Sequence, residues 1–272
     1  VTNVNDIAPV ISSDATFSAA ENQTAIGSVV ATDAEGDSLT YKVSGTEFAI
    51  SSSGVLTFVA APDFETKASY TATVTVNDGV NDTTQVITVS VTNVNDIAPV
   101  ISSDATFSAA ENQTAIGSVV ATDAEGDSLT YLVSGSKLAI SSTGVLTFVS
   151  APDYETKSSY IATVIVNDGL YSAIQQITVT VTNVNDIAPV ISSAATFSAA
   201  ENHTAIGSVV ATDAEDDPLT YKVSGTELAI SSSGVLTFVA APDFETKSSY
   251  TATVTVNDGI NSTSLELSIT IL

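Results

Sequence analysis

The feature that most constrains this 272-residue sequence is a unit repeated three times. The string VTNVNDIAPVISS begins at Val1, Val91 and Val181, so the copies follow each other every 90 residues without insertions. A unit of this size can bury a core of its own, whereas the repeats of solenoid proteins are only about 20–45 residues long. The period therefore predicts three domains in a row, each folding around its own core.

Within each unit the side chains predict short β-strands. In the first copy, residues 70–76 and 87–92 alternate between apolar and hydroxyl side chains. Further short apolar segments at 25–31, 39–43 and 55–59 are separated by clusters of Gly, Asp, Asn and Ser, and no segment has a helical period. About seven short strands in roughly 90 residues are typical of an immunoglobulin-like β-sandwich. We therefore expect an all-β chain of three tandem antiparallel β-sandwiches.

The net charge excludes several kinds of partner. Asp and Glu number 31 against 6 Lys and Arg, which gives a formal net charge of −25. Nucleic acids are excluded because they are bound through clustered basic side chains. No apolar run approaches the ~18 residues that span a bilayer, so direct membrane insertion is not expected. Cysteine is absent, which excludes disulfides and thiolate metal sites. The single histidine, His203, replaces Gln23 and Gln113 of the other copies, which indicates an exposed polar substitution.

The acidic residues gather in turns, while the outward strand positions carry Thr and Ser. In the first copy the turn acids are Glu21, Asp33, Glu35, Asp37, Asp63, Glu65, Asp78 and Asp96. Because the loops of a sandwich collect at its two ends, we expect these carboxylates where one copy meets the next. Crowded like charges repel unless solvent or a cation relieves them.

The donor atoms of these turns favour calcium. Asp, Glu and Asn offer only oxygen, which suits a hard cation; Ca²⁺ accepts 6–8 oxygens in irregular geometry, Mg²⁺ needs a strict octahedron, and Zn²⁺ prefers nitrogen or sulfur. The run from Asp33 to Asp37 superficially resembles an EF-hand loop. Its sixth position is Ser38 rather than Gly and its twelfth is Ser44 rather than Glu, so we reject that motif. Ca²⁺ is the predicted cofactor.

Four motifs, in the same order in every copy, resemble the cadherin repeat. They are AEN followed by GxVxATD, then GVL with PDFE or PDYE, then YxAxVxVxDG, and finally VND followed by Pro. The turn TDAEGDxLTY is most similar to the cadherin-like repeats of large bacterial surface adhesins. The resemblance implies calcium between successive domains, with ligands from both domains and the linker. It divides the chain into 1–8 (end of a preceding repeat and its linker), repeats 9–92, 99–182 and 189–272, and linkers 93–98 and 183–188.

The same resemblance implies the ligands. At the first joint they are Glu21, Asp63, Glu65, Asn95, Asp96, Asp123, Glu125 and Asp168. At the second they are Glu111, Asp153, Glu155, Asn185, Asp186, Asp213, Glu215 and Asp258. Half-sites are formed by Asp6, Asp33, Glu35 and Asp78 and by Glu201, Asp243 and Glu245.

The chain also departs from the cadherin pattern at both joints. Asn93 and Asn183 replace the first Asp of the linker, Ile97 and Ile187 replace its last Asn, and Glu125 and Glu215 stand where a second Asp belongs. We therefore expect between one and three ions per joint, with Asp127 and Asp217 as substitute carboxylates.

The resulting functional hypothesis is a calcium-binding, calcium-rigidified adhesion or extender segment of an extracellular, cell-surface protein. Pairs such as Asp63 and Glu65 recur without an adjoining aromatic-rich cleft, so no enzyme is expected. A carbohydrate-binding module and a homophilic self-adhesive module remain alternatives, with surface glycans or further copies as partners beside the neighbouring repeats. In the middle copy, Leu132, Ile161 and Ile165 replace Lys or Thr at outward positions, and we hypothesise one apolar contact patch there.

Overall fold

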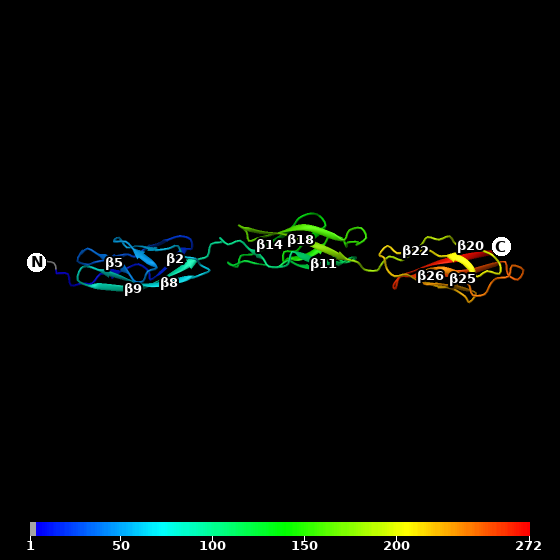
Figure 1. Ribbon diagram of the computed structural model, residues 1–272. Coiled ribbons are helices and arrows are strands. Elements are labelled where there is room, and N and C mark those ends of the chain that lie inside the picture. The colour runs from blue at the N-terminus through cyan, green and yellow to red at the C-terminus, as the bar shows by residue number, and fades with distance from the viewer. Residues whose placement is uncertain (1–3) are drawn as a thin grey trace.

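The computed structural model describes residues 4–272, and these residues contain strands and no helix. Figure 1 shows three β-sandwich modules following one another along an extended chain, with the termini at opposite ends. Each module has nine strands. In module 1 they are β1 (Val10–Ile11), β2 (Thr16–Ala20), β3 (Ala25–Ser28), β4 (Ala31–Thr32), β5 (Thr40–Val43), β6 (Phe48–Ile50), β7 (Val55–Phe58), β8 (Ser69–Asn77) and β9 (Asp82–Thr92).

The other modules repeat this order. Module 2 has β10 (Val100–Ile101), β11 (Thr106–Ala110), β12 (Ala115–Ser118), β13 (Ala121–Thr122), β14 (Thr130–Val133), β15 (Leu138–Ile140), β16 (Val145–Phe148), β17 (Ser159–Asn167) and β18 (Ser172–Thr182). Module 3 has β19 (Val190–Ile191), β20 (Thr196–Ala199), β21 (Ala205–Ser208), β22 (Ala211–Thr212), β23 (Thr220–Val223), β24 (Leu228–Ile230), β25 (Val235–Phe238), β26 (Ser249–Asn257) and β27 (Ser262–Ile271). No helix among the described residues is long and apolar enough to span a membrane.

The sheet order confirms the predicted sandwich and adds one detail. In module 1, a four-stranded sheet (β2-β9-β8-β5) faces a three-stranded sheet (β3-β7-β6), with β1 and β4 as a separate pair. We expected about seven antiparallel strands. The structure has nine, because each of the first two expected strands is divided into two short ones, β1 with β2 and β3 with β4. After β1 has paired with β4, the chain crosses over, and β2 runs parallel to β9. In the same region, a break in the register between β3 and β7, at Ala25 and Gly27, bends β3.

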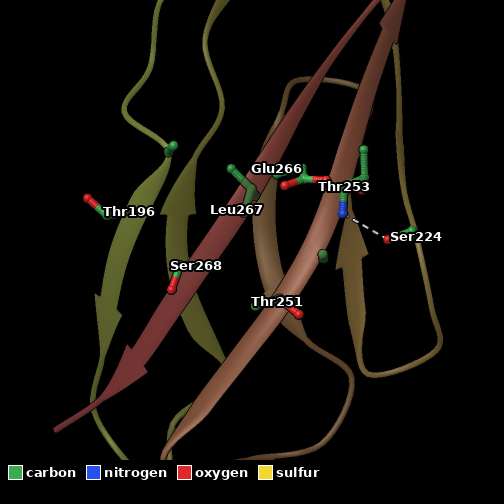
Figure 2. A pocket seen from close by; sticks show the side chains of 9 residues that line it. Thr196, Ser224, Thr251, Thr253, Glu266, Leu267 and Ser268 are labelled. Carbon is green, nitrogen blue, oxygen red and sulfur yellow. Dashed lines mark hydrogen bonds between the residues drawn. The ribbon is translucent and has the colours of Figure 1, made fainter.

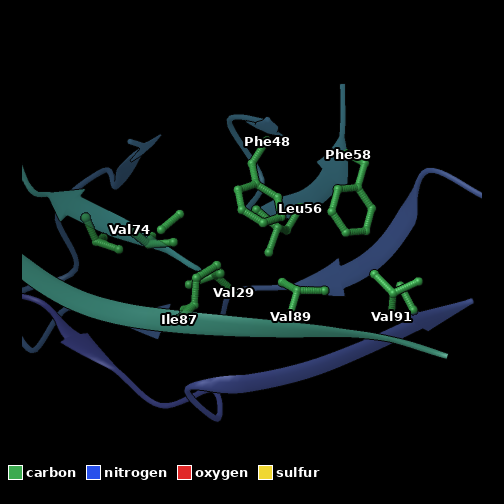
Figure 3. Close-up of a cluster of buried hydrophobic side chains, with 11 residues drawn as sticks. Val29, Phe48, Leu56, Phe58, Val74, Ile87, Val89 and Val91 are labelled. Carbon is green, nitrogen blue, oxygen red and sulfur yellow. The ribbon is translucent and has the colours of Figure 1, made fainter. Parts of the chain in front are cut away.

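The predicted alternation places the core as expected. Val74, Val76, Ile87 and Val89 of module 1 are fully buried, and Leu56 packs against them from the opposite sheet (Figure 3). The rings of Phe48 and Phe58 stack in the same core, with centroids 5.2 Å apart. Modules 2 and 3 have separate clusters of the same kind. The joints between modules are therefore left to the polar turns.

Candidate metal centres at the joints

Glu21 anchors the first joint from the module 1 side. It follows β2 at a tight turn in which Asn22 adopts a left-handed φ of 59°, a conformation that Asn tolerates better than most residues. The side chain is buried, with 2% of its surface exposed. Its carboxylate accepts hydrogen bonds from the backbone N–H of Val94 at 2.7 Å and of Phe64 at 2.8 Å. Glu21 thereby fixes the linker to the module that precedes it.

Four carboxylates from both modules and the linker meet at each joint. At the first joint, Glu21 and Glu65 come from module 1, Asp96 from the linker and Glu125 from module 2, each with an oxygen within 4.8 Å of the others. We call this group the carboxylate quartet. The second joint repeats it with Glu111, Glu155, Asp186 and Glu215. The structure thus places carboxylates of both modules and of the linker close together where one copy follows the next.

Besides belonging to the quartet, Glu125 holds the linker backbone through hydrogen bonds, which the shorter Asp of the cadherin pattern would reach less well. Its carboxylate accepts hydrogen bonds from the backbone N–H of Asp96 at 2.9 and 3.1 Å and of Ile97 at 3.0 Å. Glu215 holds Asp186 and Ile187 in the same way. Glu125 and Glu215, which replace an Asp of the cadherin pattern, thus tie each linker to the module that follows it. A carboxylate has enough lone pairs to accept such bonds and still face a cation.

Asp123 organises the acidic turn of module 2. Its Oδ1 accepts hydrogen bonds from the backbone N–H of Glu125 at 2.9 Å and of Asp127 at 3.2 Å, and these three residues have carboxylate oxygens within 4.8 Å of one another. The turn needs a left-handed residue, which is Gly126 with a φ of 81°; in module 3 Asp216 takes its place at 61°. Asp123 Oδ2 is buried and has no hydrogen-bond partner among the described residues.

Asp168 approaches the joint from the β17–β18 hairpin. It is 7% exposed, and its Oδ1 accepts hydrogen bonds from the backbone N–H of Leu170 at 2.7 Å and of Tyr171 at 2.6 Å. The linker residue Asn95 reaches it, with Nδ2 donating to the backbone oxygen of Asp168 at 3.4 Å. Asp168 Oδ2 and Asn95 Oδ1 are both buried without a hydrogen-bond partner in the described part of the chain.

The second joint has the same arrangement with one difference. Asn185 Nδ2 donates to the backbone oxygen of Asp258 at 3.3 Å, and Asp213 Oδ2 and Asp258 Oδ2 are again buried and unpartnered among the described residues. Asn185 Oδ1, however, accepts a hydrogen bond from Asn261. Module 2 has Tyr171 at the position of Asn261, so it cannot offer this donor to Asn95.

At the two ends of the chain, the half-sites also contain clustered carboxylates, and some of these accept hydrogen bonds from the backbone. The backbone N–H groups of Asp6 and Ile7 each donate to Glu35 at 3.0 Å, and Asp33, Glu35 and Asp37 form an acidic cluster. At this end Asp78 accepts hydrogen bonds from the backbone of Val80 and Asn81. At the other end Glu201, Asp243 and Glu245 lie within the same 4.8 Å limit.

Asp63 lies outside the quartet and stabilises the turn that carries Glu65. Its carboxylate accepts hydrogen bonds from the backbone N–H of Thr66 at 3.0 Å and from its hydroxyl at 2.9 Å, which lower the pKa of Asp63. Asp153 makes the same contacts with Thr156. We predicted both as ligands, and here they act as turn residues, a role that still leaves each carboxylate about two lone pairs for a cation.

Two linker contacts were missed from the sequence. Asn22 Nδ2 donates to Asp96 Oδ2, and Asn112 repeats this contact with Asp186. Asn93, in place of the first linker Asp, donates to the backbone oxygen of Glu125 at 3.3 Å. The repetition of AEN in every copy was the available signal, but only the joint geometry gives the amide its partner.

The electrostatics of the joint reflect crowded carboxylates. Burial raises the pKa of Glu65, and the charges of Glu21 and Glu125 raise it further; Glu155 is affected in the same way at the second joint. For Asp168, burial acts in the same direction, but the hydrogen bonds from Tyr171 and Leu170 outweigh it and lower the pKa. The pKa of Asp168 thus lies below its ordinary value, and that of Glu65 lies above its own.

The donor set fits a hard divalent cation. Each joint supplies only carboxylate, amide and backbone oxygens, including buried oxygens without a hydrogen-bond partner among the described residues. Unpartnered buried oxygens are unfavourable, and a cation that accepts irregular oxygen coordination would satisfy them. Residues that would hold Ca²⁺ at the first joint are Glu21, Glu65, Asp96 and Glu125 of the quartet together with Asn95, Asp123 and Asp168.

The fold and the joints define this chain as a tandem array of cadherin-like β-sandwich modules. It belongs to the bacterial Ig domain family, whose model matches residues 5–92, 95–182 and 185–271. Three cadherin repeats of mouse cadherin-23 superpose with a TM-score of 0.71 at 22% identity, covering 98% of this chain and 99% of that one.

Two curated relatives are much longer proteins. Protocadherin Fat 4 of Mus musculus is 30% identical over 230 residues, which is 76% of this chain and 5% of the relative. Chitinase A of Pseudoalteromonas piscicida is 32% identical over 154 residues, 56% of this chain and 19% of the relative. The chain thus spans less than a fifth of either relative, and what the whole relatives do does not transfer with the match.

Proposed function

We propose that this chain is a calcium-binding adhesion or extender segment of a repetitive cell-surface protein, and that calcium at its joints stiffens it. The observation that supports this most strongly is the carboxylate quartet, because its members belong to two modules and to the linker between them. Any cation held there is shared by both modules.

Some residues of the joint hold the linker backbone, and others would coordinate the cation. Glu21 and Glu125 hold the linker backbone from opposite sides through Val94, Asp96 and Ile97. Bound Ca²⁺ would supply the positive charge that the quartet lacks and would coordinate oxygens of both modules. Without it, four like charges face one another, and hydrogen bonds alone oppose their repulsion. Pro99, just after the linker, further restricts the backbone.

Several finer assignments belong to the same proposal. The repeats would span 9–92, 99–182 and 189–272, joined by linkers 93–98 and 183–188, with 1–8 ending a preceding repeat. The parent would be an extracellular, bacterial surface protein, and this segment would act without catalysing a reaction. All twenty-three residues expected as ligands from the sequence, half-sites included, remain candidates, with Asp63 and Asp153 in a supporting position.

A carbohydrate-binding module is the second candidate, favoured by the partial match to a chitinase. Sugar sites commonly stack rings on aromatic side chains, as for other ring-shaped ligands. A hollow on module 3 is lined by side chains such as Thr251, Thr253, Glu266 and Ser268, and no aromatic residue is among those that line it (Figure 2). A glycan array probed in calcium tests this candidate, and strong specific binding would favour it over a spacer.

Calcium titration by calorimetry tests the main proposal. We expect the chain to bind Ca²⁺, and the pair Glu21→Gln with Glu111→Gln to lose most of the heat by removing one quartet member at each joint. Glu47→Gln is the matched control, because Glu47 pairs with Lys67 on the exposed surface of module 1. No calcium binding by the parent chain, or equal binding by the double variant and the parent, would refute the proposal.

A further inference from the structure

The middle module differs from its neighbours on the outward face of its four-stranded sheet. Leu132 on β14 lies opposite Ile165 on β17, which in turn lies opposite Ile174 on β18. Ile161 is on the same face, four residues before Ile165. Leu132, Ile161 and Ile174 are 62–67% exposed. We call these four side chains the aliphatic ladder; its Ile174 was missed from the sequence.

The same positions are polar in the outer modules. Module 1 has Lys42, Thr75 and Thr84 in line across its sheet, with Thr71 in place of Ile161. Module 3 has Lys222, Thr255 and Ser264, and the last two hydroxyls hydrogen-bond each other at 2.9 Å. Figure 2 shows this face of module 3, where hydroxyls and Glu266 line a hollow. The backbone is therefore the same in all three modules, and only the middle one carries the ladder.

The outward face of this sheet in module 2 also carries no charged side chain. The outward positions of β11, β14, β17 and β18 carry only aliphatic, hydroxyl and amide side chains. The corresponding face of module 1 has Lys42 and Asp82, and that of module 3 has Lys222 and Glu266. Burying an unpaired charge is costly, so among the three equivalent faces only that of module 2 can be covered without this cost.

We propose that two copies of this chain associate side by side through the aliphatic ladders of their middle modules. A two-fold axis sets the same patch against itself, and two sheet faces pack about 10 Å apart with interdigitated side chains. The net charge of −25 would otherwise keep copies apart, but its acids are concentrated at the joints, away from this face. A second copy thus meets an uncharged, apolar surface that matches its own.

The size of the ladder sets the strength of the contact. Four aliphatic side chains cover roughly 400 Å² per copy, about half of what a standard interface buries on each partner. The pair is therefore weak in dilute solution. It becomes effective where many copies are held together on one surface, because linked weak contacts add avidity.

Sedimentation equilibrium up to about 1 mM protein, the range of weak pairs, tests this proposal. We expect the average mass to rise above 27.7 kDa with concentration, in calcium and in chelator alike, since the ladder is not part of a joint. The variant Leu132→Lys, Ile161→Thr, Ile165→Thr, Ile174→Thr installs the residues of module 1 and should stay monomeric with an unchanged β-sheet circular dichroism spectrum. The reciprocal variant Lys42→Leu, Thr71→Ile, Thr75→Ile, Thr84→Ile, Asp82→Ser also removes the charges of that face and should associate more strongly than the parent.

Cross-linking identifies the face in contact. The chain has no cysteine, so Thr163→Cys, between Ile161 and Ile165, introduces a single thiol. We expect a short bismaleimide, which reaches farther than a direct disulfide, to cross-link it into dimers at least tenfold faster than the matched variants Thr73→Cys and Thr253→Cys. A parent chain that stays monomeric, a four-residue variant that associates like the parent, or equal cross-linking at all three positions would each overturn the proposal.

Discussion

Asn261 Nδ2 donates a hydrogen bond of 2.8 Å to Asn185 Oδ1 at the second joint. The first joint has no counterpart, because module 2 carries Tyr171 where module 3 has Asn261, and Asn95 Oδ1 is buried without a hydrogen-bond partner among the described residues. The two joints are therefore built from nearly the same residues but offer a cation different oxygens.

This difference predicts unequal calcium affinities. A cation at the second joint competes with an amide hydrogen bond worth about 1 kcal/mol, so we expect binding there to be about fivefold weaker than at the first joint. Tyr171→Asn should weaken the first joint, and Asn261→Tyr should strengthen the second. Calorimetry in backgrounds with Glu111→Gln or Glu21→Gln isolates each joint, and equal affinities in both backgrounds would contradict the prediction.

Shortening Glu125 should loosen the linker. In Glu125→Asp the carboxylate is one methylene short of the backbone N–H groups of Asp96 and Ile97, which it now holds at about 3 Å. Hydrogen bonds to charged groups contribute about 1.5–3 kcal/mol, so amide exchange at these two residues should accelerate by about tenfold or more in chelator. The matched variant Glu215→Asp should accelerate Asp186 and Ile187 and leave the first linker unchanged. Hydrogen exchange measured by NMR separates the two linkers.

Each module should respond to core damage by itself. Leu56 is fully buried in the core of module 1, and its counterparts Leu146 and Leu236 occupy separate cores. Leu56→Ala should destabilise module 1 by about 2–5 kcal/mol through lost contacts and a cavity. Calorimetry should show one transition moving to lower temperature while the other two stay. A uniform shift of all transitions would indicate one cooperative unit instead.

The acid pH dependence without calcium follows from two opposed groups of carboxylates. The pKa values of Glu65 and Glu155 are raised above the ordinary 4.5, so these groups destabilise the folded chain near neutral pH, and this effect disappears as they become protonated. The pKa values of Asp63 and Asp168 lie below the ordinary 3.8, so their contribution to stability is present above 3.8 and lost as the pH falls further.

We therefore expect the calcium-free chain to become more stable as the pH falls through the raised pKa of the glutamates toward the ordinary 4.5, and less stable below 3.8. Thermal unfolding in calcium-free buffer measures this. In Glu65→Gln with Glu155→Gln the rise in stability should be smaller. A steady loss of stability from neutral pH downward would show that the glutamates are not crowded as described.

Much of the fold could be predicted from single residues. The alternation through Val74, Val76, Ile87 and Val89 gave the buried face directly, since side chains on a strand point to opposite sides. The crossover of β2 onto β9 could not be predicted, because Val10 and Phe17 do not show in their own side chains which sheet they join. That choice depends on the pairing of distant strands.

The candidate site divides in the same way. The position of Glu21, Glu65, Asp96 and Glu125 at one joint follows from their turns, and the sequence predicted it. The hydrogen bonds of Glu125 to the linker and of Asn22 to Asp96 depend on how two modules meet, so no local pattern contains them. Ile174 was missed because its importance comes from its register opposite Ile165.

Calcium-dependent stiffening is tested most directly by small-angle X-ray scattering of this chain in chelator and in millimolar calcium. Because the joints connect modules that share no core, their stiffness decides the overall dimension. We expect an extended rod in calcium, and a smaller, more variable maximum dimension in chelator. Glu21→Gln with Glu111→Gln should resemble the chelated chain under both conditions. The same scattering profile from the parent chain with and without calcium would contradict calcium-dependent stiffening.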